Sequence, residues 1–261
     1  MSIFPRRSLG QHFLRDPNVA RKIVAALQAP EEAHVVEIGP GEGALTGFLQ
    51  DRFATFTAIE IDRRAAAFLQ DARPEIDVRQ MDVLDVDWRA LAGEKGAPIC
   101  VAGNLPYHIT SPILFNLLDA RDVLQEIVVM MQREVAERLV AVPRTKAYGI
   151  LSVLCQALAH PEILFRVSPH VFYPRPAVTS AVVRLTFSGK EDAPEGVDMP
   201  FFRSVVRTAF NRRRKTLRNG LERWTRGAMG ITLPDGLGAR RPEELTPEEF
   251  VALARYLKAR T

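Results

Sequence analysis

Short apolar runs alternate with stretches of helix-spaced apolar residues along most of this 261-residue chain. Many of the runs end at a glycine or a polar residue, which is typical of strands buried in a parallel sheet. The alternation predicts an α/β fold with a Rossmann-like, doubly wound sheet. We expect strands over residues 34–38, 56–59, 76–81, 99–102, 126–131, 163–167 and 181–187.

Helix signals stand between these runs. Asp16 and Pro17 predict a helix start, because aspartate is a favoured N-cap residue and proline fits the first helical position. Residues 2–14 show no clear periodicity, so we expect them to lie over the surface. Further helices are expected from Ala44, from Ser111-Pro112, over 134–140 and from Ala147.

The C-terminal part of the chain has a different organisation. A polar, proline-containing stretch over 189–200 predicts a linker, and an amphipathic helix starting near Phe201 follows it. The last helix opens on Thr246-Pro247-Glu248-Glu249, the pattern of a capping box. We therefore predict two domains, a larger α/β domain over 1–188 and a small helical domain over 189–261.

A glycine-rich turn joins the first predicted strand to the next helix. In Gly39-Pro40-Gly41-Glu42-Gly43, the glycines Gly39 and Gly41 allow the backbone to approach a ligand at a helix N-terminus. Glu60 lies about 20 residues further on, where an acid accepts hydrogen bonds from ribose hydroxyls. By itself this turn suits a dinucleotide as well as S-adenosylmethionine.

Four candidate ligand-binding residues close the first four predicted strands. Gly39, Glu60, Asp82 and Asn104 stand at carboxyl ends, the edge where ligands bind in open α/β sheets. Asp82 can accept from a cofactor's adenine amino group there, although taken alone it is interpreted as an N-cap or turn residue. Since Pro40 stiffens the turn and residue 44 is not glycine, nothing requires a pyrophosphate. We favour S-adenosylmethionine as the cofactor.

The motif Asn104-Leu105-Pro106-Tyr107 suits a site that holds the amino group of an adenine. Asn104 has a side-chain carbonyl acceptor, and Pro106 fixes the backbone so that the carbonyl of Leu105 can be another. Tyr107 offers a stacking face worth about 1–3 kcal/mol per base. In isolation, the motif equally suits a strand that ends in an Asn-Pro turn with a half-buried tyrosine.

An aromatic loop joins two predicted strands that should lie next to the same edge. It has the sequence Phe172-Tyr173-Pro174-Arg175-Pro176. We interpret Phe172 as a second stacking face for the base, opposite Tyr107. The alternative interpretation, and the commoner use of loop aromatics, is a lid on the hydrophobic core.

Positive charge is concentrated near the C-terminus. The composition is otherwise ordinary, with 47% hydrophobic and 25% charged residues and a net charge of +4. Such a local excess predicts a polyanionic partner, and we favour nucleic acid over a solvated helix face. The candidate nucleic-acid-binding residues are Arg207, Arg212, Arg213, Arg214, Lys215 and Arg218.

Cysteine and histidine spacing argues against a disulfide or a metal site. Cys100 and Cys155 stand far apart in apolar runs and are expected to be buried, reduced thiols of a cytosolic protein. The five histidines show no ligand spacing, so we expect no metal. No apolar run approaches the ~18 residues that span a bilayer, and none follows Arg6-Arg7, so we expect neither a membrane span nor a targeting signal.

Five motifs occur in order along nearly the whole chain. They are Gly10-Gln11-His12-Phe13-Leu14, Val36-Glu37-Ile38-Gly39-Pro40-Gly41, Asn104-Leu105-Pro106-Tyr107, Phe172-x-Pro174-x-Pro176-x-Val178-x-Ser180 continuing through Ala181-Val182-Val183-Arg184-Leu185, and Ala209-Phe210-Asn211-x-Arg213-Arg214-Lys215-Thr216. In combination this pattern resembles the KsgA (RsmA)-type ribosomal RNA adenine N6,N6-dimethyltransferases. The combination is specific, whereas the glycine turn alone is not.

The resemblance implies an S-adenosylmethionine-dependent methyltransferase domain over 1–188 and an RNA-binding helical domain over 189–261. It also implies methyl transfer to N6 of two adjacent adenosines in a hairpin loop near the 3′ end of 16S rRNA. The N6,N6-dimethyladenosines would form late in small-subunit biogenesis. The partner would then be small-subunit rRNA within a 30S or pre-30S particle in the cytoplasm, and we expect a monomer.

The resemblance also assigns cofactor-binding roles by position. His12 and Leu14 would close over the cofactor, and the turn at Gly39 and Gly41 would lie under its methionine part. His12 and His108 stand where many relatives have asparagine. Both histidine and asparagine form hydrogen bonds, so these departures affect only the fine contacts.

Three strand-end residues complete the expected cofactor site. By resemblance, Glu60 would hold the ribose, Asp82 the cofactor adenine, and Asn104 would lie where cofactor and target base meet. Methyl transfer from a sulfonium releases a neutral thioether, so the reaction requires neither a strong base nor a metal. Catalysis would then rest mostly on positioning and electrostatics.

Several alternatives remain open from the sequence. A nicotinamide-dependent oxidoreductase explains the glycine turn but neither the motif at Asn104 nor the basic cluster. A DNA adenine methyltransferase shares the chemistry, and the macrolide-resistance methyltransferases of large-subunit rRNA are similar to the family. A non-catalytic assembly factor is the alternative outside the enzymes, although the intact acceptors and acids favour catalysis.

Overall fold

The computed structural model of this protein describes residues 3–6, 9–96, 98–187, 197–226 and 229–261. The chain divides into two compact units, and each unit is built from two segments of sequence. The first comprises Met1–Ala136 and His160–Gly189, and the second comprises Glu137–Ala159 and Lys190–Thr261. This division differs from the predicted boundary between 188 and 189, because residues 137–159 belong to the second unit.

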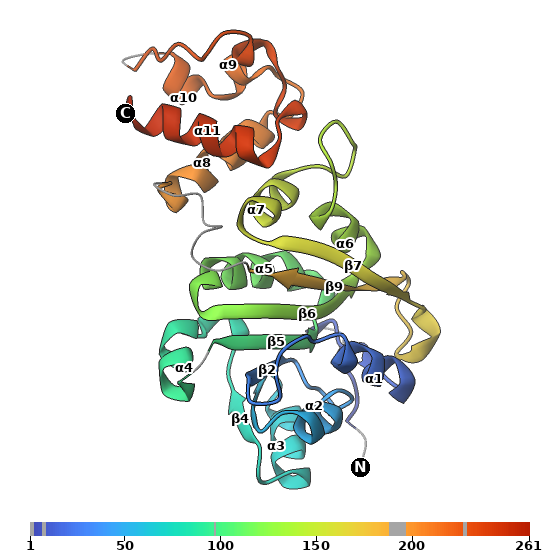
Figure 1. The fold of residues 1–261 in the computed structure, drawn as a ribbon. Coiled ribbons are helices and arrows are strands. Elements are labelled where there is room, and N and C mark those ends of the chain that lie inside the picture. The colour runs from blue at the N-terminus through green and yellow to red at the C-terminus, as the bar shows by residue number, and fades with distance from the viewer. Residues whose placement is uncertain (1–2, 7–8, 97, 188–196, 227–228) are drawn as a thin grey trace. The chain divides into compact units, whose positions relative to one another are not determined.

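A mostly parallel sheet forms the centre of the first unit (Figure 1). Among the described residues it has seven strands in the order β4-β3-β2-β5-β6-β9-β7. Only β9 in this sheet is antiparallel to its neighbours, β6 and β7. The predicted strands are confirmed, with small shifts at their ends. Their bounds are β2 (His34–Ile38), β3 (Thr55–Glu60), β4 (Asp77–Gln80), β5 (Ile99–Asn104), β6 (Leu124–Gln132), β7 (His160–Val167) and β9 (Ser180–Thr186).

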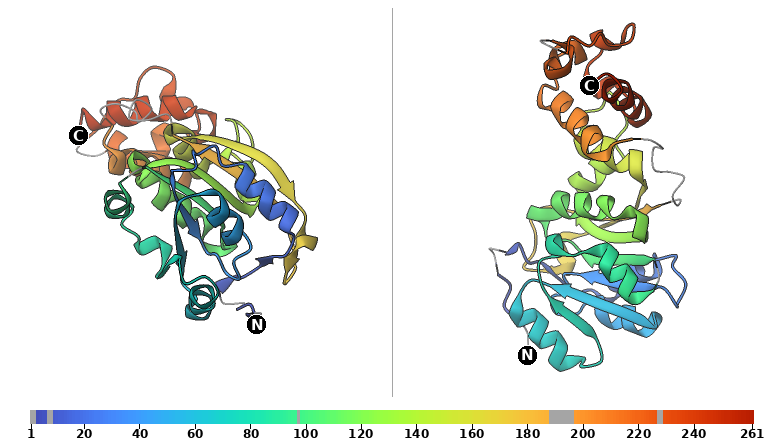
Figure 2. Two further views of the ribbon diagram at one scale, coloured as in Figure 1. Left: turned by 60° about the horizontal axis from the view of Figure 1, so that its bottom comes forward. Right: turned by 90° about the vertical axis from the view of Figure 1, so that its left-hand side faces the viewer.

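Helices cover both faces of this sheet, as Figure 2 shows from two directions. Val35 and Val128 pack in one core cluster with residues of α1 and α2. Their neighbours Val36 and Val129 point to the opposite face and are just as buried. Burial on both faces explains the nearly continuous apolar runs in the sequence. The helices are α1 (Pro17–Ala25), α2 (Thr46–Arg52), α3 (Arg63–Ala72), α4 (Trp88–Lys95), α5 (Thr110–Asp119) and α6 (Arg133–Leu139), the last of which ends in the second unit.

The helix start predicted at Asp16 and Pro17 is confirmed. The Asp16 carboxylate accepts hydrogen bonds from the backbone N–H groups of Asn18 at 2.8 Å and Val19 at 3.3 Å. The next helix, α2, begins at Thr46 instead of Ala44, because the turn after β2 extends through residue 45. No helix in the described part of the chain combines the length and hydrophobicity needed to cross a bilayer.

A short antiparallel pair joins the N-terminal segment to the aromatic loop. β1 (Phe13–Leu14) pairs with β8 (Phe172–Tyr173), with Phe13 opposite Tyr173 and Leu14 opposite Phe172. Phe13 and Leu14 are buried, so the expectation that residues 2–14 lie over the surface is wrong at its C-terminal end. A strand of two residues is too short to produce a detectable period.

Helices form the second unit, whose core lies between α7, α8 and α11. Tyr148, just before α7, is buried and its ring contacts Phe210 of α8. Phe210 in turn stacks on Phe250 of α11, with ring centroids 5.6 Å apart. The bounds are α7 (Ile150–Leu158), α8 (Met199–Asn211), α9 (Leu217–Gly220), α10 (Glu222–Thr225) and α11 (Pro247–Lys258).

The helix expected from Ala147 is present as α7 and is buried, and its packing explains the shifted boundary. α7 packs against α8 and α11, which come from the C-terminal segment. Sequence order alone had assigned it to the first domain. The predicted capping box of α11 is present, since Glu249 N–H donates to Thr246 Oγ1 at 3.2 Å and Thr246 N–H donates to Glu249 Oε2 at 2.8 Å. Most of the predicted linker over 189–200 lies outside the described residues.

Both cysteines are buried and unpaired, as predicted. Burial raises the pKa of the Cys100 thiol to about 12, so this group stays protonated at neutral pH. Burial likewise raises the pKa of Cys155 far above its usual range. Neither thiol is available as a nucleophile, because the reactive form is the thiolate.

Candidate active site

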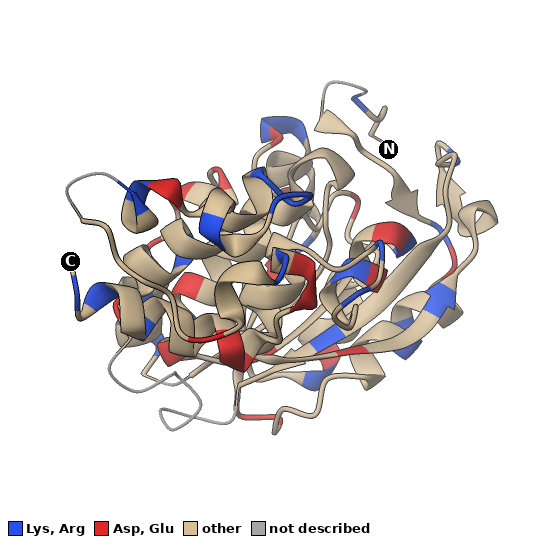
Figure 3. Cartoon of the chain, turned by 90° about the horizontal axis from the view of Figure 1, so that it is seen from above, with Lys and Arg blue, Asp and Glu red and all other residues tan. Residues whose placement is uncertain are grey.

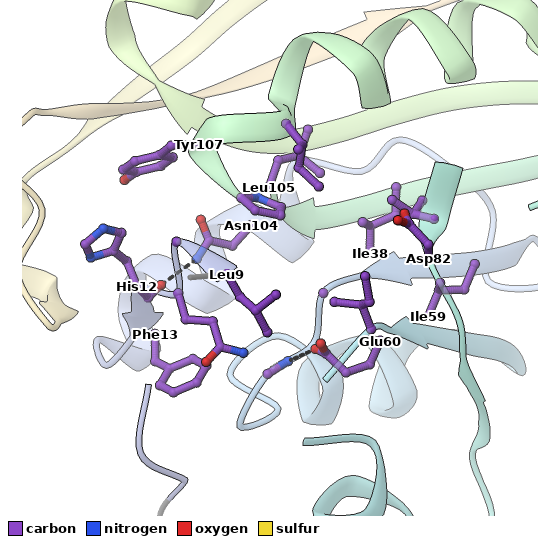
Figure 4. A pocket seen from close by; sticks show the side chains of 18 of the residues that line it. Leu9, His12, Phe13, Ile38, Ile59, Glu60, Asp82, Asn104, Leu105 and Tyr107 are labelled. Atoms are coloured by element: carbon purple, nitrogen blue, oxygen red, sulfur yellow. Dashed lines mark hydrogen bonds between the residues drawn. The ribbon is translucent and has the colours of Figure 1, made fainter. Parts of the chain in front are cut away.

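A cavity open to solvent lies at the carboxyl ends of the parallel strands in the first unit (Figure 4). Its walls come from the ends of β2, β3 and β5 and from the N-terminal segment Leu9–Phe13, here called the strap. The predicted residues that line it are His12, Gly39, Gly41, Glu60, Asp82, Asn104, Leu105, Pro106 and Tyr107.

The turn after β2 requires glycine at the positions that face the cavity. Gly39 and Gly41 have φ angles of +66° and +57°, which side chains rarely adopt. A Cβ atom on Gly41 would lie 2.8 Å from the Phe13 ring. The absence of side chains at the turn therefore leaves its backbone accessible to a ligand while the strap packs over it.

Glu60, the last residue of β3, presents a buried carboxylate to the same cavity. It is 4% exposed, and its two oxygens accept from the backbone N–H groups of Gly41 at 3.0 Å and Asp62 at 2.9 Å. Burial raises its pKa, while these hydrogen bonds favour the charged form. Each carboxylate oxygen has a further lone pair, so Glu60 can still accept from ligand hydroxyls.

Glu37 is a buried acid that the sequence analysis did not assign to the site. It lies in β2 just before the turn, is 2% exposed, and accepts a hydrogen bond from the Thr46 hydroxyl at 2.7 Å. Burial raises its pKa to about 8. The available signal was a charged residue inside an otherwise apolar strand, Val35-Val36-Glu37-Ile38. Because this pKa lies above neutral, Glu37 is mostly protonated at pH 7, and its contact with Thr46 supports the turn instead of adding charge to the cavity.

Asp82 caps a helix, as its position alone indicated, and it also lines the cavity. Its Oδ1 atom accepts from the Leu84 N–H at 2.9 Å, so it caps the short 3-10 helix Val83–Asp85. It also lines the cavity, two residues beyond the end of β4. The aspartate is therefore held by its own helix start while its remaining oxygen stays available for a donor.

The orientation of the Asn104 side chain is decided by the strap. Its Nδ2 atom donates to the backbone carbonyl of His12 at 2.9 Å, across two segments far apart in sequence. The reverse orientation would place two carbonyl oxygens against each other. Asn104 Oδ1 is buried and has no hydrogen-bond partner among the described residues. A buried acceptor left without a partner costs about 1–3 kcal/mol, so this atom suits a ligand N–H.

Tyr107 stands at the edge of the cavity against His12. Their rings are stacked, with centroids 5.3 Å apart and planes inclined by 27° (Figure 4). The Tyr107 hydroxyl is hydrogen-bonded to Ser180 Oγ at 2.6 Å. His12 Nδ1 lies 2.7 Å from the Pro174 carbonyl, and because a carbonyl only accepts, this nitrogen carries the proton. The aromatic loop therefore holds the His12 ring, and β9, the strand that follows the loop, holds the Tyr107 ring.

Two predicted site residues face the core instead of the cavity. Phe172 and Leu14 are each 5% exposed and pack in the hydrophobic cluster beneath α1 and α2. Because they are partners in the β1–β8 pair, they point to the same face. Phe172 is therefore not retained as the second stacking face. Leu14 also lines a small cavity next to Gly39 and Asn104, so its role at the cofactor stays a prediction. Phe13, which alternates with Leu14, lines the cavity, and strand alternation could have indicated it.

The basic cluster divides into paired and unpaired side chains. Arg207 lies on α8, but α8 ends at Asn211 and residues 212–215 form the turn after it. Arg212 pairs with Glu222 and Arg213 with Glu243, both at 2.6 Å. Basic and acidic positions are correspondingly interspersed along the chain in Figure 3. The cations that are exposed and have neither a hydrogen bond nor an ion pair within the described ranges are Arg214, Lys215 and Arg218.

Arg213 links separate segments of the second unit, a structural role that its position in the basic cluster did not indicate. Besides the ion pair with Glu243, its guanidinium donates to the backbone carbonyls of Lys146 at 3.1 Å and Thr145 at 3.0 Å. Three of its donor nitrogens are thus used within the second unit. The prediction that Arg213 binds nucleic acid directly is therefore replaced by a role in holding this unit together.

The strand order, the glycine turn and the polar residues at the strand ends define an S-adenosylmethionine-dependent methyltransferase. The sequence profile described as "Ribosomal RNA adenine dimethylase" matches residues 5–256. The chain belongs to this family, and it is an S-adenosylmethionine-dependent ribosomal RNA adenine dimethyltransferase.

Named relatives agree with this assignment. The chain is 55% identical over 255 residues to "Ribosomal RNA small subunit methyltransferase A" of Salinibacter ruber, covering 98% of this chain and 86% of the relative. The protein of the same name from Bacteroides thetaiotaomicron is 41% identical over 260 residues, with 97% and 94% covered. The sequence-based assignment to the KsgA type is confirmed.

Solved structures share the fold. A dimethyladenosine transferase from Plasmodium falciparum superposes with a TM-score of 0.79 at 23% identity, over 95% of this chain and 98% of that one. The 23S rRNA methyltransferase ErmE superposes with a TM-score of 0.68 at 28% identity, over 94% and 99%. These similarities confirm the predicted Rossmann-like sheet with an additional helical part.

The residues of the cavity fit S-adenosylmethionine. The glycine turn offers backbone without side chains, and Glu60 retains acceptor capacity for ribose hydroxyls. Asp82 offers an oxygen for an adenine amino group. The buried Glu60 carboxylate provides negative charge for a ligand that carries a sulfonium and an ammonium group. Apolar side chains of Ile38, Ile59 and Met81 supply the remaining walls.

Proposed function

We propose that this protein dimethylates N6 of two adjacent adenosines in a hairpin loop near the 3′ end of small-subunit rRNA. The substrate would be the rRNA within a 30S or pre-30S particle in the cytoplasm, and the enzyme would act as a monomer. The names of the relatives from Salinibacter ruber and Bacteroides thetaiotaomicron support the small subunit as the substrate.

The observation that carries the proposal is the free, buried Oδ1 atom of Asn104. An adenine amino group is a poor nucleophile because its lone pair is delocalised into the ring. An acceptor that binds one amino hydrogen favours the pyramidal nitrogen that forms during attack. The backbone carbonyl of Leu105 is the proposed second acceptor. Such fixed acceptors act by positioning and electrostatics.

S-adenosylmethionine, when bound, supplies an electrophilic methyl group on a sulfonium. Glu60, Asp82 and the turn at Gly39 and Gly41 would hold the cofactor, which leaves Asn104 at the junction of cofactor and target base. The product thioether is neutral, so no residue of the chain has to protonate a leaving group. The amino proton can leave to solvent after the new bond has formed.

The target adenine has to leave its stack to reach Asn104. Extrusion costs a few kcal/mol and is least costly for a base in a loop. Tyr107 is the stacking face for this base, and stacking offsets about 1–3 kcal/mol. Because Phe172 is buried, His12 is the aromatic ring next to Tyr107 on the described chain. Its ring would shift or stack when the base enters.

RNA outside the site would be held by exposed cations of the second unit. Arg214, Lys215 and Arg218 are exposed, and Arg207 on α8 is exposed as well. Arg212 is engaged by Glu222 but remains about half exposed, at 52%, and can share its charge with a phosphate. Binding through such contacts weakens steeply with salt.

The test is incubation of the enzyme with labelled S-adenosylmethionine and unmodified small subunits, followed by mapping of methylated adenines. We expect dimethylation of two adjacent adenosines in one hairpin loop. Large subunits and duplex DNA serve as competing substrates. Preferential labelling of either would contradict the proposal and favour a large-subunit or a DNA methyltransferase.

A further inference from the structure

The loop between α6 and α7 exposes an unusual set of side chains on the second unit. Val142 is 60% exposed, and the Arg144 side chain is 74% exposed. Lys146 is exposed and makes no side-chain hydrogen bond or ion pair with a described residue. None of these residues lines the cofactor cavity. Residues 142–146, here called the 142–146 loop, therefore present one apolar and two cationic side chains to solvent.

This loop is held in a single conformation despite its exposure. Arg144 has a φ angle of +69°. Among the described residues it is the only one other than glycine in the left-handed region. Its N–H donates to the backbone carbonyl of Glu243 at 2.7 Å. The Thr145 hydroxyl donates to the Val142 carbonyl at 2.7 Å. A strained residue persists only where its surroundings fix it, and such residues cluster at functional sites.

Arg213 connects this loop to the turn that carries the unpaired cations. Its guanidinium donates to the carbonyls of Thr145 and Lys146, so residues 145–146 lie within reach of one arginine side chain from residue 213. The next two residues, Arg214 and Lys215, are exposed and unpaired within the described ranges. The 142–146 loop and the 214–215 turn are therefore neighbouring segments of one surface.

We propose that Arg144, Lys146, Arg214 and Lys215 form one phosphate-binding surface, here called the loop–turn surface, for the sugar–phosphate backbone of the substrate RNA. This inference rests on the proposed function for its RNA partner and extends it to a segment outside the basic motif. The acids near these cations are Glu244, whose carboxylate is 4.0 Å from the Arg144 guanidinium, and Glu222 and Glu243, which form ion pairs with Arg212 and Arg213. The surface thus has a net positive charge.

The composition of the surface favours RNA over an acidic protein. Lysine is depleted in the cores of protein interfaces, which are enriched in aromatic residues. Phosphate oxygens, in contrast, are bound mainly by lysine and arginine side chains. Val142 supplies an exposed apolar contact for a sugar. Because hydrogen bonds already fix this loop before RNA binds, little conformational entropy is lost on association.

The experiment measures the salt dependence of binding to protein-free small-subunit rRNA for the full-length chain. The variant Arg144→Ala/Lys146→Ala removes the two loop cations, and Arg21→Ala/Lys22→Ala removes two exposed cations of α1 as the matched control. Each lost phosphate contact reduces the slope of log K against log salt by about 0.7–0.9. We expect the loop variant to reduce the slope by about 1.5 and the control to leave it unchanged.

A single substitution, Lys146→Glu, separates an effect on RNA binding from an effect on folding. The Lys146 side chain makes no hydrogen bond or ion pair with a described residue, so the melting temperature should not change while RNA binding weakens. Equal slopes for the loop variant and the control would overturn the proposal. A loss seen with assembled subunits but not with protein-free rRNA would also overturn it and indicate a ribosomal protein as the partner. A failure of the proposed function is distinguishable from a failure of this inference. In that case the unsubstituted enzyme would not transfer methyl groups to small subunits.

Discussion

The Asn104 amide donates a hydrogen bond to the backbone carbonyl of His12. This contact joins the end of β5 to the strap and leaves Asn104 Oδ1 as an acceptor without a partner on the described chain. The strap thereby selects which end of the amide a substrate meets. The His12 carbonyl therefore fixes the orientation of Asn104 Oδ1. Because this carbonyl belongs to the backbone, a change of side chain at residue 12 does not remove it.

Replacement of Asn104 by alanine should abolish methyl transfer with little effect on cofactor binding. The change removes the acceptor for the target amino group, and loss of one such electrostatic contact costs about 10²–10³-fold in kcat. Single-turnover methyl transfer and equilibrium binding of S-adenosylmethionine measure the two effects separately. Methyl transfer at the unsubstituted rate would refute the role of Asn104, and loss of cofactor binding would assign it to the cofactor instead.

Substitutions at Tyr107 should separate its ring from its hydroxyl. Tyr107→Ala removes the stacking face and should raise KM for RNA by about 5–150-fold, the equivalent of 1–3 kcal/mol. Tyr107→Phe keeps the ring and loses only the hydrogen bond to Ser180. We expect a smaller effect from the phenylalanine variant, measured by steady-state kinetics with varied RNA concentration. Equal effects of the two variants would show that the hydroxyl, not the stacking face, is required.

Neighbouring residues of the basic cluster should behave differently. Arg213→Ala removes an ion pair and two hydrogen bonds to backbone carbonyls, and should lower the free energy of unfolding by about 1–3 kcal/mol. Arg214→Ala/Lys215→Ala removes exposed, unpaired charges and should leave stability unchanged while reducing the salt slope of RNA binding by about 1–2. Chemical denaturation and salt-dependent RNA binding test both. The reverse pattern would contradict the division into structural and RNA-binding residues.

Glu37 should make the protein less stable as pH rises. Its pKa is about 8 in the folded protein against 4.5 for the ordinary group, so unfolding releases a proton between these values and the free energy of unfolding falls as pH rises through them. His34 has the opposite dependence below pH 6.5, because burial lowers its pKa to about 4. The effect of Glu37 is therefore best measured between pH 6.5 and 8.

The matched variant for this prediction is Glu37→Gln, which retains an oxygen for the Thr46 hydroxyl and cannot ionise. Denaturant midpoints without cofactor should fall less between pH 6.5 and 8 for Glu37→Gln than for the unsubstituted protein. The variant should also be the more stable of the two at pH 8. Parallel pH profiles would indicate that Glu37 is already ionised in the folded protein.

The sequence alone determined the features that depend on local conformation or on a single strand. Glycines at 39 and 41 are required by the backbone angles of one turn, and Asp16 caps a helix through its own neighbours. The apolar runs indicated the strands because both faces of the sheet are buried. Since parallel strands bring their carboxyl ends to one edge, their order in the sequence was sufficient to gather Glu60, Asp82 and Asn104 at one cavity.

Only the tertiary structure decided contacts between segments far apart in the chain. The β1–β8 pair turns Leu14 and Phe172 into the core and Phe13 toward the cavity. Arg213 forms an ion pair with Glu243, which lies 30 residues further along the chain. α7 is buried by α8 and α11, which also come from a distant part of the sequence. Local sequence specifies which conformation a residue adopts, but which face is buried and which charge is paired depends on neighbours that only folding brings together.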